Sequence, residues 1–176
     1  PIPRTLALTI YGDLDITLLD EMPAGRKPVE TEIVGPGQHA PMYEHVRNEL
    51  KAGRQAYVIC PRIEEADPAK ENALNLKSVV AEAERLQTSE FRDYRVGILH
   101  GKMTSTEKEQ TMTRFATHEI DVLVATSVVE VGVNVPNATN IIIEGAERFG
   151  LAQLHQLRGR VIRGTHQPYC FAVTES

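Results

Sequence analysis

The stretch from His155 to Gly164, HQLRGRVIRG, places three arginines and two glycines within ten residues. If it is helical, Gln156, Arg160 and Arg163 fall at positions i, i+4 and i+7, on one face of the helix. Arginine presents a rigid fork of donors that matches phosphate oxygens and keeps its charge, so such a pair suits a polyphosphate. Two arginines on a helix face also suit a solvated surface. Gly159 favours a ligand, because glycine inside a helix costs about 1 kcal/mol relative to alanine and indicates close approach by a backbone or a ligand.

Other polar residues follow apolar runs that are typical of buried strands. One run ends at Thr126 and Ser127, where hydroxyls and backbone N–H groups could hold a nucleic-acid phosphate, and Asn134 could reach a ribose hydroxyl. An ordinary strand-to-helix loop with a capping hydroxyl explains the Thr-Ser pair equally well. His100 ends another run, in the string GILHGKM, where a single histidine is usually a hydrogen-bonded structural residue.

A scaffold for these residues follows from the alternation of apolar runs and amphipathic segments. The apolar runs are short, rich in β-branched residues and apolar on consecutive positions, which is typical of strands buried on both faces. We expect strands at Gln55–Cys60, Tyr94–His100, Asp121–Thr126, Asn140–Glu144 and Tyr169–Val173. We expect helices at Met42–Ala52, Asn72–Gln87, Thr106–Thr117 and Gly150–Val161.

Strands that alternate with helices imply right-handed crossovers. The expected fold class is therefore α/β, a doubly wound, mainly parallel sheet with helices on both faces. The polar segment from Arg62 to Asn72 has no apolar period and predicts an exposed loop. Ligands of such sheets collect beyond the carboxyl ends of the strands, which is where the polar residues described above lie.

Composition excludes several classes of protein. With 41% hydrophobic and 24% charged residues in 176, the chain can bury a core, which argues against disorder. A formal net charge of -5 argues against a protein held on nucleic acid by bulk charge, but it is compatible with a local basic groove. Cys60 and Cys170 lack metal-ligand spacing, so buried thiols and a reducing, cytoplasmic location are expected. No apolar run reaches the length of a membrane span.

Three strings, in this order, resemble the second motor domain of superfamily 2 helicases, and most closely that of RecG-type ATP-dependent DNA helicases. PIPRTLALTIYGDLD is similar to the crossing from the family's first motor domain, VLVATSVVEVGVNVPNAT to motif V, and ERFGLAQLHQLRGRVIRG to motif VI. The resemblance covers essentially the whole chain and implies a RecA-like helicase C-terminal domain. It divides the chain into residues 1–34, a segment linking from a first motor domain, and residues 35–176, the RecA-like domain.

The resemblance implies an active site divided between two domains. In the family, ATP binds between two RecA-like domains, and the first supplies the phosphate loop and the acids that hold Mg²⁺. Motif VI then makes Arg160 and Arg163 arginine fingers, with Gln156 nearby, and motif V places Gly132 and Asn134 near the nucleotide. The chain has no G-x-x-x-x-G-K-[ST] phosphate loop. We therefore expect a monomer that hydrolyses ATP only together with its first RecA-like domain.

The resemblance also implies contacts with the backbone of branched DNA. Thr126 and Ser127 correspond to contacts from motif V, and Arg62, His100 and Gly101 occupy further contact positions at strand ends. Such contacts grip phosphates without reading bases, as a translocating motor requires. The implied function is that of the C-terminal motor domain of a DNA helicase or translocase in replication fork rescue, recombination and repair.

Two departures from the family pattern leave an alternative open. Motif VI usually reads Gly-Arg-x-Gly-Arg, and Ile162 stands here for the second glycine, so a β-branched side chain could displace Arg163. Asn134 stands for the aspartate usual in motif V and lacks its charge. The alternative is a non-catalytic nucleic-acid-binding or interaction module that keeps the fold but has a degenerate motif VI.

Overall fold

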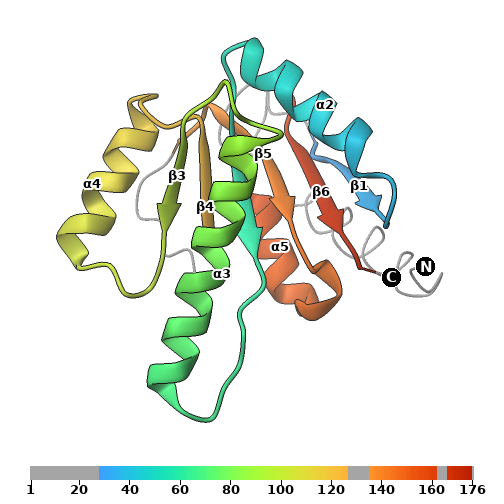
Figure 1. Ribbon diagram of the computed structural model, residues 1–176. Helices are drawn as coiled ribbons and strands as arrows, with labels where there is room; N and C mark the ends of the chain where they lie inside the picture. Colours follow the sequence, from blue (N-terminus) through green and yellow to red (C-terminus); the bar gives the residue numbers. More distant parts are fainter. Residues whose placement is uncertain (1–27, 127–134, 162–165, 176) are drawn as a thin grey trace.

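The computed structural model describes residues 28–126, 135–161 and 166–175. Within these residues, six parallel strands form one sheet in the order β1-β6-β5-β2-β4-β3 (Figure 1). The strands are β1 (Glu30–Val34), β2 (Gln55–Cys60), β3 (Val96–Leu99), β4 (Val122–Thr126), β5 (Ala138–Ile143) and β6 (Tyr169–Val173). The predicted doubly wound parallel sheet is confirmed, and each of the five predicted strands is present.

Helices cover both faces of this sheet (Figure 1). They are α2 (His39–Lys51), α3 (Pro68–Thr88), α4 (Ser105–Ala116) and α5 (Leu151–Gly159), with a short 3₁₀ helix, η1 (Ala146–Arg148), before α5. The apolar sides of α2 and α3 pack on one face, and those of α4 and α5 pack on the other. Because both faces are covered, every residue of β2, β4 and β5 is buried, which explains why apolar residues stand on consecutive positions in these strands.

Strand β1 is not predicted from the sequence. The prediction groups Glu30–Val34 with the N-terminal segment, whereas in the structure these residues pair in parallel with β6, from Glu30 opposite Tyr169 to Val34 opposite Val173. Charged residues alternate with others in ETEIV, as suits an edge strand, so the apolar run that marks the central strands is missing. The predicted linking role of residues 1–34 concerns mainly residues 1–27, which lie outside the described part of the chain.

Helix α3 begins earlier than the sequence predicts. The predicted exposed loop extends to Asn72, but α3 starts at Pro68, so the prediction is wrong from that residue onward. Asp67 caps the helix by accepting a hydrogen bond from the backbone N–H of Ala69 at 3.0 Å, and proline is favourable in a first helical turn. The first turn is exposed, so no apolar period marks it, and the Asp-Pro pair was the available signal.

Both cysteines are free and buried, as predicted. Burial raises the pKa of the Cys60 thiol well above its ordinary value and that of the Cys170 thiol to about 12. Neither thiol is therefore a reactive thiolate near neutral pH. Among the described helices, none is long and apolar enough to cross a membrane.

Arg158, one of the three arginines between His155 and Gly164, belongs to the core. It is 1% exposed and ranks among the largest fully buried side chains in the described part of the chain. Its Nη2 atom lies 3.5 Å from the carbonyl oxygen of Val29, just before β1. Arg158 thus ties α5 to the start of the edge strand, and its place in the stretch reflects packing.

Replacing Arg158 should destabilise the fold. Arg158→Ala is expected to lower the free energy of unfolding by about 2–4 kcal/mol, because it leaves a cavity and removes buried hydrogen bonds. Arg148→Ala is the matched control, since Arg148 is 53% exposed in its ion pair with Glu175, and the expected change is below about 1 kcal/mol. Urea denaturation measures both variants. Equal changes would contradict the assignment of Arg158 to the core.

Candidate nucleic-acid interface

Four of the five residues predicted to contact a DNA backbone line one pocket. It lies where the carboxyl ends of the parallel strands meet, which we call the carboxyl edge of the sheet. The pocket has a volume of about 190 Å³. Its lining residues are Arg62, Asn72, Asn75, Leu76, His100, Gly101, Lys102 and Thr126. The fifth predicted contact, Ser127, lies outside the described residues.

The order of the strands brings these residues together. Strand β4 lies between β2 and β3, and its last residue, Thr126, is opposite Cys60 of β2. Parallel strands end at the same edge of a sheet, so the residues that follow β2 and β3 meet beside Thr126. Arg62 and His100 are far apart in the sequence, but the sheet places both at this edge.

The turn after β3 presents hydrogen-bond donors to the pocket. Burial lowers the pKa of His100, so its imidazole is largely neutral at pH 7. Its Nδ1 atom accepts a hydrogen bond from the backbone N–H of Lys102 at 3.1 Å, which leaves the ring proton on Nε2. A Cβ atom placed on Gly101 would meet no atom within 4 Å, so the backbone of the turn is open to a ligand.

Asn75 fixes the loop after β2, a role that the sequence did not reveal. Its Oδ1 atom accepts a hydrogen bond from the backbone N–H of Ile63 at 2.8 Å, and its Nδ2 atom donates to the carbonyl oxygen of Ile63 at 3.1 Å. Nδ2 also donates to the carbonyl oxygen of Glu71 at 2.8 Å, one turn earlier in α3. An asparagine at a polar helix position carries no signal for this clamp, because its partner lies in a separate loop.

Arg62 contacts both the pocket and an internal carboxylate. Its Nε atom donates a hydrogen bond to Oε1 of Glu71 at 2.9 Å, and its Nη2 atom donates to the same oxygen. The Arg62 side chain is 53% exposed, whereas that of Glu71 is 16% exposed. The guanidinium can therefore be reached from solvent while the carboxylate is held against the protein.

The residues predicted to act on ATP are described only in part. Gln156 is exposed on α5, and Arg160 is half-buried just beyond its last residue, with φ -65° and ψ -26°. Helix α5 ends at Gly159, so the predicted ridge of side chains is not contained in one regular helix. A Cβ atom on Gly159 would meet no atom within 4 Å, so the predicted close approach of a backbone is not found among the described residues. Four residues lie outside the described part: Gly132, Asn134, Ile162 and Arg163.

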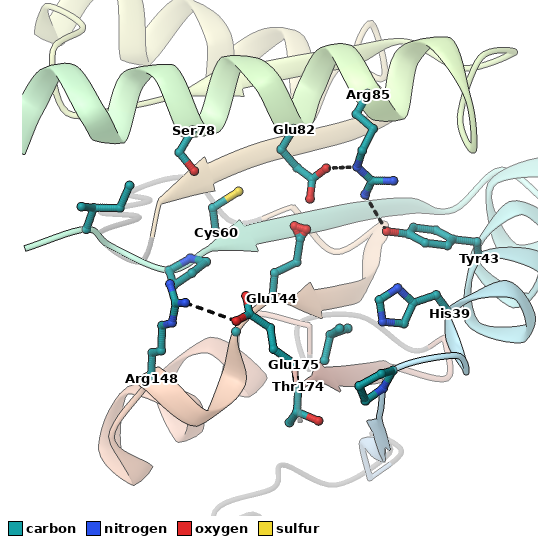
Figure 2. A pocket seen from close by; sticks show the side chains of 15 residues that line it. His39, Tyr43, Cys60, Ser78, Glu82, Arg85, Glu144, Arg148, Thr174 and Glu175 are labelled. Carbon is teal, nitrogen blue, oxygen red and sulfur yellow. Dashed lines mark hydrogen bonds and ion pairs between the residues drawn. The ribbon is translucent and has the colours of Figure 1, made fainter. Parts of the chain in front are cut away.

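A larger pocket, of about 510 Å³, lies at the carboxyl ends of β2, β5 and β6 (Figure 2). Glu82 of α3 and Glu144, just after β5, extend toward each other in it (Figure 2). Arg85 donates hydrogen bonds to Glu82 and to the hydroxyl of Tyr43, the latter at 3.0 Å. None of the predicted site residues in the described part of the chain lines this pocket. The sequence did not predict Glu82 and Arg85 as site residues, because charged residues on a helix are typical of a solvated face.

The two carboxyl groups of this pocket share one proton near neutral pH. Burial raises the pKa of Glu144 to about 9, reinforced by the hydrogen bond and the negative charge of Glu82. Burial also acts to raise the pKa of Glu82, but hydrogen bonds with Glu144 and Arg85 bring it below its ordinary value. Glu144 is therefore protonated and Glu82 ionised at neutral pH. In the described part of the chain, no three His, Cys, Asp or Glu side chains gather as metal ligands.

Glu144→Gln tests the shared proton. Glu144 holds its proton to about pH 9 in the folded state, whereas the unfolded chain releases it at about pH 4.3. Stability contributed through this group is therefore lost as pH rises between these values. Relative to the wild type, the glutamine variant should gain at least about 1 kcal/mol between about pH 5 and about pH 8, measured by urea denaturation. Glu84→Gln, at an exposed position of α3, should show no such gain, and a pH-independent effect of Glu144→Gln would contradict the shared proton.

The helicase conserved C-terminal domain family matches residues 41–165 of this chain. The ATP-dependent DNA helicase RecG of Synechocystis sp. is 49% identical over 176 residues, which are 100% of this chain and 21% of that protein. RecG of Bacillus subtilis is 49% identical over 176 residues, which cover 99% of this chain and 25% of that protein. The chain thus spans about a fifth to a quarter of the length of these relatives.

Solved structures agree with the sequence relatives. A RecG bound to a three-way DNA junction superposes with a TM-score of 0.72 at 43% identity, over 100% of this chain and 22% of that one. Domain 2 of the DEAD-box helicase Mss116p, bound to an RNA duplex, gives a TM-score of 0.58 at 17% identity, over 82% of this chain and 54% of that one, and shows the fold alone. This chain belongs to the helicase conserved C-terminal domain family, as a RecA-like domain of the RecG type.

Proposed function

We propose that this chain is the second motor domain of an ATP-dependent DNA helicase or translocase, and that its pocket of about 190 Å³ grips the DNA backbone. The observation that carries the proposal is the convergence of Arg62, His100, Gly101 and Thr126. These residues follow or end three different strands. Their meeting in one pocket is what a backbone-contact site requires.

The chemistry of the pocket suits phosphate groups. Arg62 and Lys102 supply positive charge, and the neutral imidazole of His100 supplies an N–H donor. Charged and neutral donors of this kind bind phosphate oxygens without reading bases, as a motor that moves along DNA requires. Because the chain has a net charge of -5, the attraction for DNA must be local to this edge of the sheet.

We propose branched DNA as the substrate. The RecG structure at 43% identity is bound to a three-way DNA junction. The curated relatives are named ATP-dependent DNA helicase RecG. This similarity supports roles in replication fork rescue, recombination and repair.

The ATP-dependent step is proposed to occur between this domain and a first RecA-like domain, which holds most of the nucleotide and its Mg²⁺. Arg160 and Arg163 act as arginine fingers with Gln156 beside them, and Gly132 and Asn134 lie next to the nucleotide. Arginine fingers stabilise the charge of phosphoryl transfer and accelerate it by about 10³–10⁵-fold. Gln156 is exposed, and Arg160 is partly exposed, so both can face a second domain.

Removing single cations from the pocket should weaken DNA binding. Arg62→Ala and Lys102→Ala are each expected to weaken the affinity for a three-way DNA junction by about three- to tenfold, and to reduce the salt slope of log K by about 0.7–0.9. The measurement is a binding titration at several salt concentrations. Arg92→Ala is the matched control, because Arg92 is exposed before β3, at the opposite edge of the sheet. Equal losses at Arg62 and Arg92, or a marked preference for one base sequence, would argue against the backbone grip.

Arg160→Ala separates the motor from the alternative of a non-catalytic module with a degenerate motif VI, which Ile162 favours. In a protein that joins this chain to the first motor domain of a RecG helicase, DNA-stimulated ATP turnover should fall at least about 10³-fold. The chain alone should show no turnover. If the joined wild type binds ATP and DNA but does not hydrolyse ATP, the non-catalytic module is the correct function.

A further inference from the structure

The partner of Arg62 is itself an anion placed where a phosphate could bind. One carboxylate oxygen of Glu71 accepts both hydrogen bonds from the Arg62 guanidinium. The other oxygen lies 3.4 Å from the backbone N–H of Glu65. A guanidinium and a backbone N–H converging on one anion are the same pair of donors that proteins use for phosphate.

The start of α3 fixes this carboxylate. Asp67 caps the helix and accepts the backbone N–H of Glu71 at 2.9 Å through its carbonyl oxygen, so Glu71 sits in the first turn. Asn75, one turn later, holds the backbone of Ile63 and thereby the loop that carries Arg62. The hydrogen bond from Arg62 lowers the pKa of Glu71, so the group is an anion near neutral pH.

The Arg62 side chain is held less firmly than that of Glu71. Its side chain is 53% exposed, against 16% for Glu71, and it also borders the pocket formed with His100 and Lys102. An ion pair of this exposure is weak, so an incoming phosphate can displace the carboxylate. The surrounding loop adds further negative charge at Glu64 and Glu65, which line another pocket together with Arg62 and Glu71.

We propose that Glu71 competes with the DNA backbone for Arg62 and so sets the affinity and salt dependence of this contact. The inference rests on the proposed function, because it takes the phosphate of DNA as the competing anion. DNA binding at Arg62 exchanges one anion for another. The contact therefore contributes less to the affinity for DNA than a contact from an unpaired arginine would. A motor must release each phosphate as it moves, so a weak contact suits it.

The test is DNA binding over a range of salt concentrations with the full chain and a three-way DNA junction. Glu71→Gln keeps the shape but removes the charge, and it should tighten binding by about two- to fivefold. Its salt slope should become steeper, by less than the change that Arg62→Ala produces, since the charge of Arg62 is no longer shared with Glu71. Glu71→Asp keeps the charge and should bind much as the wild type does. Glu84→Gln, an equal charge change at an exposed position of α3, should alter affinity by less than about 1.5-fold.

Arg62→Ala distinguishes competition from a structural role of Glu71. In the Arg62→Ala background, Glu71→Gln should have no further effect, because the residue for which the two anions compete is gone. If Glu71→Gln weakens binding or leaves it unchanged while Arg62→Ala weakens it, Glu71 only supports the loop and the inference is wrong. If Arg62→Ala leaves binding unchanged, the proposed DNA contact fails and the inference fails with it. Thermal unfolding of each variant shows whether the fold is retained.

Discussion

Burial of a parallel sheet on both faces is the constraint on which the rest of this structure depends. Strands β2, β4 and β5 are wholly buried, so each must be followed by a helix or a loop that returns over one face. All strands then run in one direction and end at one edge. The polar residues that follow β2 and β3 meet Thr126, the last residue of β4, there for that reason, and the pockets of about 190 Å³ and 510 Å³ open at this edge. The position of the candidate interface is thus a consequence of core formation.

Buried and half-buried polar side chains hold the loops that the sheet leaves free. Gln55 donates from Nε2 to the carbonyl oxygens of Phe115 at 2.6 Å and Ile120 at 2.8 Å, and so joins the end of α4 to the start of β2. Asn75 likewise joins α3 to the loop after β2, and Arg158 joins α5 to the segment before β1. Groups of this kind are costly to bury without partners, so they select one arrangement of the chain. A loop fixed in this way can present Arg62 in a defined place.

Electrostatic balance shapes the carboxyl edge as much as geometry does. Two cations there have acidic partners: Glu71 pairs with Arg62, and Glu82 pairs with Arg85. In the larger pocket, burial keeps a proton on Glu144 instead of a second negative charge. Acidic residues therefore partly neutralise the positive charge at the same edge of the sheet that is proposed to bind DNA. A chain with a net charge of -5 can still offer a phosphate site, because only a few donors at one edge need to converge.

The sequence by itself determined the fold class, the five strands other than β1, and the family. Apolar runs and long motif strings are local properties of the chain, so the sequence alone reveals them. It also placed Thr126 and His100 at the ends of strands, and the resemblance added Arg62 and Gly101 as predicted contacts. Tertiary structure decided what depends on partners distant in sequence. Edge strand β1 lacks an apolar run, Asn75 clamps a loop outside its own helix, and Arg158 is buried although arginine is usually exposed. The pairing of Glu82 with Glu144 belongs to the same class, because the effect of burial on a carboxyl group depends on what the fold packs around it.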